Sequence, residues 1–135
     1  MHKSVKLPIG EKVIVLHCKG SLRGKHLEEH KNRFPSVNFV EIACAGMVNP
    51  IVMFKSLMEG AGGVIVYACP EFDCHNFDGN QFAKRRVFSA KNVAEALGID
   101  PWRMVYIQRD RLDPGQLTRT ISSLKKNLAE KEVAV

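Results

Sequence analysis

The sequence predicts an α/β fold, a three-layer sandwich around a four-stranded parallel sheet in the strand order 2-1-3-4, like flavodoxin and Rossmann-type domains. Short apolar runs alternate along the chain with longer segments of helical periodicity, which is the pattern of strands joined by helices. One of these runs, residues 63–68, is apolar throughout, as is typical of a parallel strand covered on both faces. Right-handed crossovers between such strands place helices on both sides of the sheet.

The first elements follow a polar lead-in over residues 1–12. Residues 13–17 predict a strand, which the strand order makes central. Residues 22–33 are charged and compatible with a helix, and Pro35 ends it because the residue before a proline is disfavoured in the helical region. Residues 37–43 alternate apolar and polar side chains, so they predict a strand with one wetter face, at or near the sheet edge.

The second helix has clear start and stop signals. Asn49 is a capping residue, Pro50 suits the first helical position, and Gly60 suits the C-terminal end. The glycines at 60, 62 and 63 resemble a phosphate-binding loop in composition. They precede a strand instead of following one, so they do not place backbone N–H groups at a helix N-terminus as that motif requires.

The second half of the chain continues the alternation. After the strand at 63–68, Asn80 is expected to cap a helix that runs to about residue 97, where Gly98 ends it. Residues 104–108 predict the fourth strand, and the sequence Asp-Pro-Gly at 113–115 opens a last helix that runs to about residue 128. The tail over residues 130–135 is expected to fray.

Length and composition favour a single cytoplasmic domain over residues 1–135. The chain has 135 residues, of which 45% are hydrophobic, enough to bury one core. It shows neither a secretory signal nor an apolar run long enough to span a membrane. The net charge of +6 is spread along the chain without an aromatic-rich basic motif, so nucleic acid is not an expected partner.

The four cysteines are the strongest functional signal. Cys18, Cys44 and Cys69 each come directly after a predicted strand, and Cys74 lies on the loop that follows Cys69. The carboxyl ends of parallel strands lie along one edge of the sheet, where such folds bind ligands. The four thiols are therefore expected to converge, and in a reducing compartment they are more typical of metal ligands or redox groups than of structural disulfides.

The spacing of these cysteines favours an iron–sulfur site, with two alternatives open. Cys69 and Cys74 form a Cys-x-x-x-x-Cys pair, whereas zinc ribbons draw on two close Cys-x-x-Cys pairs. The alternatives are a zinc-stabilised or metal-free adaptor domain, and a thiol oxidoreductase that uses Cys69 and Cys74. His75 is a candidate to hydrogen-bond a cluster sulfur or to replace a ligand, although a loop histidine also commonly faces solvent.

A second metal-like pattern, His26-Leu-Glu-Glu-His30, matches the H-x-x-E-H string of inverted zinc metalloproteases. A polar helix face produces such a string easily, and the sequence marks no third ligand. A solvated helix face is the preferred interpretation.

The ordered motifs resemble a known family, the small iron–sulfur delta subunit of methyl-viologen-reducing hydrogenases, over roughly residues 11–128. The motifs are, in order, Cys44-Ala-Gly-Met-Val-Asn-Pro50, Gly60-Ala-Gly-Gly-Val-Ile-Val, Cys69, Asp73-Cys-His75, Gly79-Asn80 and Arg85-Arg86. The resemblance implies an electron-transfer subunit with a 2Fe-2S cluster. It would relay electrons between a hydrogenase, a formate dehydrogenase-like or another donor and a flavoprotein of the heterodisulfide reductase A-like type.

The chain departs from the family pattern in two places. The family typically reads Cys-His-Pro-Gly-Asp-Cys-His, where this chain has Cys69-Pro-Glu-Phe-Asp-Cys-His75. The family also tends to carry Cys-x-x-Cys after the first strand, where this chain has Cys18-Lys-Gly-Ser21. Four cysteines remain, which is the number that a 2Fe-2S cluster takes.

The loop after the third strand is also the expected docking surface for a partner subunit. It carries Phe72 and Phe77 ahead of the basic residues Lys84, Arg85 and Arg86. Apolar anchors ringed by charge suit docking to a flavin- or iron–sulfur-containing subunit.

Overall fold

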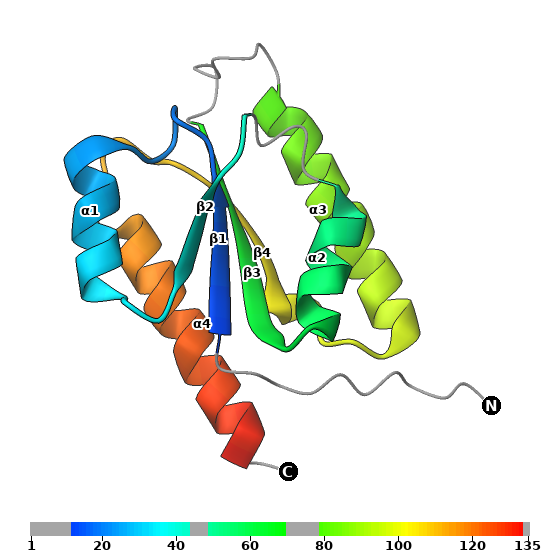
Figure 1. Cartoon of the computed structure of the whole chain (residues 1–135). Helices are drawn as coiled ribbons and strands as arrows, with labels where there is room; N and C mark the ends of the chain where they lie inside the picture. The colour runs from blue at the N-terminus through cyan, green and yellow to red at the C-terminus, as the bar shows by residue number, and fades with distance from the viewer. Residues whose placement is uncertain (1–11, 44–48, 70–78, 134–135) are drawn as a thin grey trace.

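The computed structural model describes residues 12–43, 49–69 and 79–133, which form a sheet between two layers of helices (Figure 1). Its elements lie within one or two residues of most predicted bounds. In chain order they are β1 (Lys12–His17), α1 (Gly24–Arg33), β2 (Asn38–Glu41), α2 (Pro50–Met58), β3 (Ala61–Ala68), α3 (Gly79–Leu97), the short 3-10 helix η2 (Pro101–Arg103), β4 (Met104–Gln108) and α4 (Gln116–Val133).

The sheet has the predicted topology. Its four strands are parallel and lie in the order β2-β1-β3-β4, so β1 is central and β2 is an edge strand. In the register, His17 of β1 stands opposite Glu41 of β2 and Tyr67 of β3. All the residues of β3 are buried, as its continuous apolar sequence predicts.

Two hydrophobic clusters hold the layers together, one on each face of the sheet. Helices α2 and α3 cover one face, and α1 and α4 cover the other (Figure 1). The alternation of side chains along each strand divides the core between the two faces. The first cluster includes Leu16, Met53, Leu57, Val64, Val66, Val87, Ala94 and Met104, and the second includes Val13, Val15, Leu22, Ile65, Leu117, Ile121, Leu124 and Leu128.

The helix signals read from the sequence are confirmed for α2 and at the end of α3. Asn49 Oδ1 accepts the Ile51 N–H at 2.9 Å, which satisfies one of the donors left free at a helix start. Gly60 and Gly98 have φ of 105° and 80°. These are left-handed conformations, in which a helix ends most easily at glycine.

Several boundaries differ from the prediction, and one short helix is additional. Helix α1 begins at Gly24 instead of residue 22, because the N–H groups of Ser21 and Leu22 bond to Cys18 O in a separate turn. Asn80 lies inside α3 and does not precede it, since that helix begins at Gly79. Helix α4 continues to Val133, through part of the tail expected to fray. The 3-10 helix η2 was not predicted.

Arg103 is a buried charge at the amino end of the sheet. It is 2% exposed, and its Nε and Nη2 donate to Gly62 O at 2.8 Å and Ala61 O at 3.0 Å. Burial lowers the pKa of its guanidinium group. Gly63 lies next to this contact, where a Cβ would be 2.7 Å from Leu124 Cδ2. A larger residue here would force Leu124 to shift, so the close packing of β3 against η2 and α4 favours a glycine.

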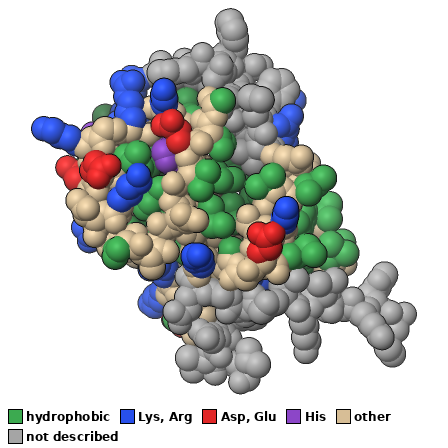
Figure 2. Space-filling model, in the orientation of Figure 1, with side chains coloured by type: hydrophobic (Ala, Val, Ile, Leu, Met, Phe, Trp, Pro, Cys, Tyr) green, Lys and Arg blue, Asp and Glu red, His purple; other side chains and the backbone are tan. Residues whose placement is uncertain are grey.

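The two helical layers present different surfaces. Figure 2 shows hydrophobic side chains gathered on the side of α2 and charged ones on the side of α1. On α2 the exposed apolar residues are Ile51, Val52 and Met58, and α1 has no buried residue. Among the described residues, no helix combines the length and the apolar character needed to cross a membrane.

Candidate metal centre

Two of the predicted ligands meet at the carboxyl edge of the sheet. Cys18 follows β1 and Cys69 follows β3, and these two strands are hydrogen-bonded neighbours. The sulfur atoms of the two residues are 3.2 Å apart although 51 positions separate them in the sequence. Both side chains are buried, with exposures of 4% and 2%. The parallel topology thus brings two strand-end thiols together, as their positions after neighbouring strands predict.

The separation of the two sulfurs fits joint ligation of a metal. Neither cysteine is part of a disulfide, and 3.2 Å is well beyond a disulfide bond of about 2.05 Å. Two thiolates on one tetrahedral metal, each about 2.3 Å from it, lie about 3.8 Å apart. A small side-chain adjustment would bring Cys18 and Cys69 to that separation. The donor set therefore fits an iron–sulfur or zinc centre.

A tight turn fixes the position of Cys18. Its carbonyl oxygen accepts the backbone N–H groups of Ser21 and Leu22, both at 3.1 Å. Its own N–H donates to Ser21 Oγ at 3.0 Å, and the Ser21 hydroxyl donates back to Cys18 O at 2.9 Å. Leu22 anchors the turn in the core beneath α1 and α4. Hydrogen bonds within the turn and the packing of Leu22 thus hold the backbone of Cys18 in place.

The surroundings of Cys18 favour its thiolate form. Burial by itself raises the pKa of the Cys18 thiol, but hydrogen bonds from the Ser21 hydroxyl, the Cys69 thiol and the backbone N–H groups of Ser21 and Gly20 outweigh it, so the pKa is lowered. Arg109, directly after β4, reaches Gly20 O with its Nη1 at 3.5 Å. Thiolates are the form that binds metals, so this turn is prepared for ligation.

His17 is a buried histidine next to Cys18 in the chain. It is 1% exposed and contacts Phe39 edge to face, with ring centroids 6.5 Å apart. Burial lowers the pKa of His17. This effect is larger than the opposing effects of the Cys18 and Leu22 backbone and of the Glu41 charge. Among the described atoms, His17 Nδ1 has no hydrogen-bond partner. The lowered pKa favours the neutral ring, which adds no positive charge next to Cys18 in the chain.

The other candidate ligands, Cys44, Cys74 and His75, lie outside the described residues, so their roles stay predictions. Within the described ranges, no three His, Cys, Asp or Glu side chains gather as a metal site. This holds for the H-x-x-E-H string of α1, where His30 Nδ1 lies 2.6 Å from His26 O of its own helix.

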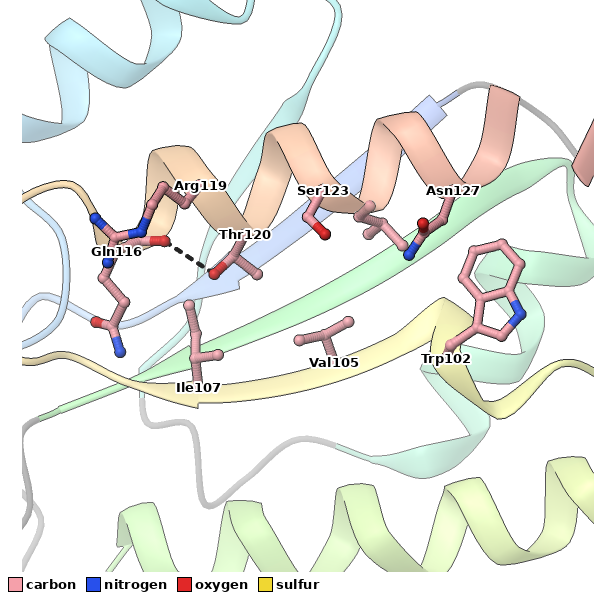
Figure 3. A pocket seen from close by; sticks show the side chains of 9 residues that line it. Trp102, Val105, Ile107, Gln116, Arg119, Thr120, Ser123 and Asn127 are labelled. Carbon is pink, nitrogen blue, oxygen red and sulfur yellow. Dashed lines mark hydrogen bonds between the residues drawn. The ribbon is translucent and has the colours of Figure 1, made fainter. Parts of the chain in front are cut away.

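In the part of the chain that the structure describes, a groove borders β4 on each face of the sheet, and neither groove is lined by Cys18 or Cys69. Figure 3 shows the larger, of about 410 Å³, between β4 and α4. The smaller, of about 250 Å³, lies against α3. The lining of the first is Trp102, Val105, Ile107, Gln116, Arg119, Thr120, Ser123, Leu124 and Asn127, and that of the second is Lys84, Val87, Phe88, Lys91, Tyr106 and Gln108.

Three residues that shape this edge of the sheet were not predicted from the sequence. Ser21 carries a weak signal, because it lies three positions after Cys18, the spacing at which a turn returns to its first residue. Arg109 carries a signal only through its place directly after a strand. His17 carries none, since a histidine in an apolar strand gives no indication of what its ring contacts.

Comparison with known proteins finds a family match over nearly the whole domain. Residues 13–130 match the family model described as methyl-viologen-reducing hydrogenase, delta subunit. The F420-non-reducing hydrogenase iron–sulfur subunit of Archaeoglobus profundus is 40% identical over 70 residues, which are 52% of this chain and 51% of that protein. The vhc iron–sulfur subunit of the F420-non-reducing hydrogenase of Methanococcus voltae is 33% identical over 72 residues, 53% of this chain and 50% of that protein.

A further relative is much longer. It is one of the subunits of the Ferredoxin/F(420)H(2)-dependent CoB-CoM heterodisulfide reductase of Methanosarcina acetivorans, 31% identical over 99 residues, 73% of this chain but 12% of that protein. The chain therefore spans about half the length of the iron–sulfur subunits that it matches and a small part of the reductase protein. On the match over residues 13–130, the chain belongs to the family of methyl-viologen-reducing hydrogenase delta subunits.

Proposed function

We propose that this protein is an electron-transfer subunit with a 2Fe-2S cluster held by Cys18, Cys44, Cys69 and Cys74. It would work in the cytoplasm and relay electrons between a hydrogenase-type or other donor and a heterodisulfide-reductase-type flavoprotein. When bound, such a cluster supplies one-electron chemistry. The role of the chain is then to hold the sulfur ligands, exclude water from them and present the site to partners.

One observation carries this proposal, the contact between the buried sulfurs of Cys18 and Cys69 at 3.2 Å. The donors around Cys18 lower its pKa despite burial, as a thiolate ligand requires. Relatives that share half their length with this chain are named iron–sulfur subunits. Cys18 and Cys69 also lie at the carboxyl edge of the sheet, which is where α/β folds of this type bind small molecules and cofactors.

The cluster is tested by anaerobic purification of the protein followed by iron and sulfide analysis. We expect about two iron and two inorganic sulfide atoms per chain, with a visible absorption that bleaches on reduction. Zinc without iron would instead favour the zinc-stabilised adaptor. A metal-free protein whose Cys69 and Cys74 titrate as a redox-active dithiol would favour the thiol oxidoreductase.

A loop at the same edge of the sheet offers a docking anchor for a partner subunit. Leu112, after β4, is 94% exposed, and hydrogen bonds brace the loop around it. Leu112 N donates to Asp110 Oδ1 at 2.9 Å, and Asp110 N donates to Gln116 Oε1 at 3.0 Å. Arg109 and Arg111 precede Leu112 in the chain. A braced apolar tip beside basic side chains suits an apolar pocket with an acidic rim, and the expected anchors Phe72 and Phe77 lie outside the described residues.

Replacing the exposed leucine is expected to weaken binding to the partner. Leu112→Ser should raise the Kd for the heterodisulfide reductase A-like flavoprotein of the same organism about tenfold, because an anchor in a desolvated pocket contributes about 1–2 kcal/mol or more, and about 1.4 kcal/mol corresponds to tenfold. Biolayer interferometry with the purified flavoprotein measures it. Met58→Ser is the matched control, since Met58 is 66% exposed on α2, away from the loop after β4. Equal effects of the two substitutions would place the interface elsewhere.

A further inference from the structure

The Ser21 hydroxyl lies against the sulfur of Cys18 and is enclosed by the fold. Ser21 is 1% exposed, and its Oγ is 3.5 Å from Cys18 Sγ. In the thiol form the sulfur donates to this oxygen, while the hydroxyl proton is given to Cys18 O at 2.9 Å. A serine has a single proton to donate. The carbonyl oxygen and the sulfur of the same cysteine are therefore alternative acceptors for it.

The carbonyl oxygen is able to give up this proton without being left unsatisfied. Cys18 O also accepts the backbone N–H groups of Ser21 and Leu22, both at 3.1 Å. A carbonyl oxygen has two lone pairs, so these two bonds suffice for it. A sulfur that carries negative charge is the stronger acceptor, because hydrogen bonds to ionised groups are about twice as strong as neutral ones. Once Cys18 is a thiolate ligand, rotation of the hydroxyl directs its proton to Sγ.

We propose that Ser21 is a positioning residue that raises the reduction potential of the cluster held by Cys18. The inference rests on the function proposed above. Reduction adds one electron to the cluster and increases the negative charge on its sulfur ligands, while the proton stays on the serine oxygen. A hydrogen bond that strengthens on reduction stabilises the reduced state. The bond from Ser21 to Cys18 Sγ therefore makes the cluster easier to reduce.

The test is a redox titration of the iron-containing protein, followed by visible absorption, in three variants. At the midpoint potential of the parent, Ser21→Ala should lower the ratio of reduced to oxidised cluster about tenfold, which is about 59 mV for one electron. Ser21→Thr keeps the hydroxyl and should restore most of the potential. Ser56→Ala is the matched control, because Ser56 Oγ donates to Val52 O at 2.8 Å on α2, and its potential should equal that of the parent.

A second measurement needs no cluster. In reduced, iron-free protein, the S–H stretching band of Cys18 in the infrared should move to higher frequency in Ser21→Ala, since the thiol loses its acceptor, and should not move in Ser56→Ala. This measurement tests the hydrogen bond between Ser21 and Cys18 even if Ser21→Ala takes up no iron. An S–H band that does not move in Ser21→Ala overturns the proposal.

The two proposals fail in different ways. An iron-containing Ser21→Ala protein with the potential of the parent overturns the role of Ser21 and leaves the proposed function standing. A parent protein that takes up no iron overturns the proposed function. It also overturns the proposed effect of Ser21, because there is then no cluster whose reduction potential Ser21 could raise.

Discussion

Cys69→Ser should abolish iron binding while the protein stays folded, and Cys44→Ser should do the same. Cys69 Sγ is 3.2 Å from Cys18 Sγ, so its loss removes one of the two proposed ligands that the fold already holds together. Serine oxygen is a much poorer ligand than thiolate for the iron of such clusters. We expect iron content to fall by at least about tenfold, with little change in far-ultraviolet circular dichroism measured on the same samples.

The folded state should survive because the core does not depend on the metal. Two clusters of buried aliphatic side chains pack the helices on both faces of the sheet, unlike small zinc domains that are unfolded without their ion. Cys18→Ser serves as the third variant. The hydroxyl of Ser21 bonds to the backbone N–H and carbonyl oxygen of residue 18, so this substitution should leave the turn intact. Complete unfolding of all three variants would show instead that the centre is structural. Full retention of iron in Cys69→Ser would contradict its assignment as a ligand.

The fold was predictable from the sequence because its signals are local or follow from general rules. The continuous apolar run of β3 indicates burial on both faces, and Asn49 and Gly60 mark the ends of α2 by their own conformational preferences. Full burial places β3 inside the sheet, and crossover handedness places helices on both faces. The start of α1 was less predictable, because residues 21 and 22 bond to Cys18, and composition does not show where a turn ends and a helix begins.

The contact between Cys18 and Cys69 was predictable from the sequence, but the residues that surround it were not. The placement of Cys18 and Cys69 after neighbouring strands was enough to bring them together. The bonds between Ser21 and Cys18 depend on the shape of one turn, and the contact of Arg109 with Gly20 O joins positions 89 residues apart. The role of Arg103 was not predictable for a different reason, because a basic residue ahead of a strand normally indicates a solvated surface.

Arg103 is the residue outside the candidate metal centre whose loss should be most costly to stability. Its guanidinium group is buried at the amino end of the sheet, where it donates to the carbonyl oxygens of Ala61 and Gly62 at the start of β3. A buried cation is tolerated only when its donors are used. Hydrogen bonds from charged donors each contribute about 1.5–3 kcal/mol, and buried acceptors left without a donor add a penalty. This side chain therefore connects the segment before β4 to the central strand β3.

Arg103→Met should accordingly lower the free energy of unfolding by about 2–4 kcal/mol, since it keeps much of the side-chain volume but removes the hydrogen bonds to Ala61 O and Gly62 O. For a domain of this size, that corresponds to a fall in Tm of roughly 6–15 °C, measurable by thermal denaturation. Arg85→Met is the matched control: Arg85 is exposed on α3, so its substitution should change stability by no more than about 0.5 kcal/mol. If both variants melt at the same temperature, the bonds of Arg103 to β3 do not stabilise the fold. A loss confined to Arg103→Met would show that the amino end of the sheet depends on this buried charge for its stability, independently of the candidate metal centre at the opposite end.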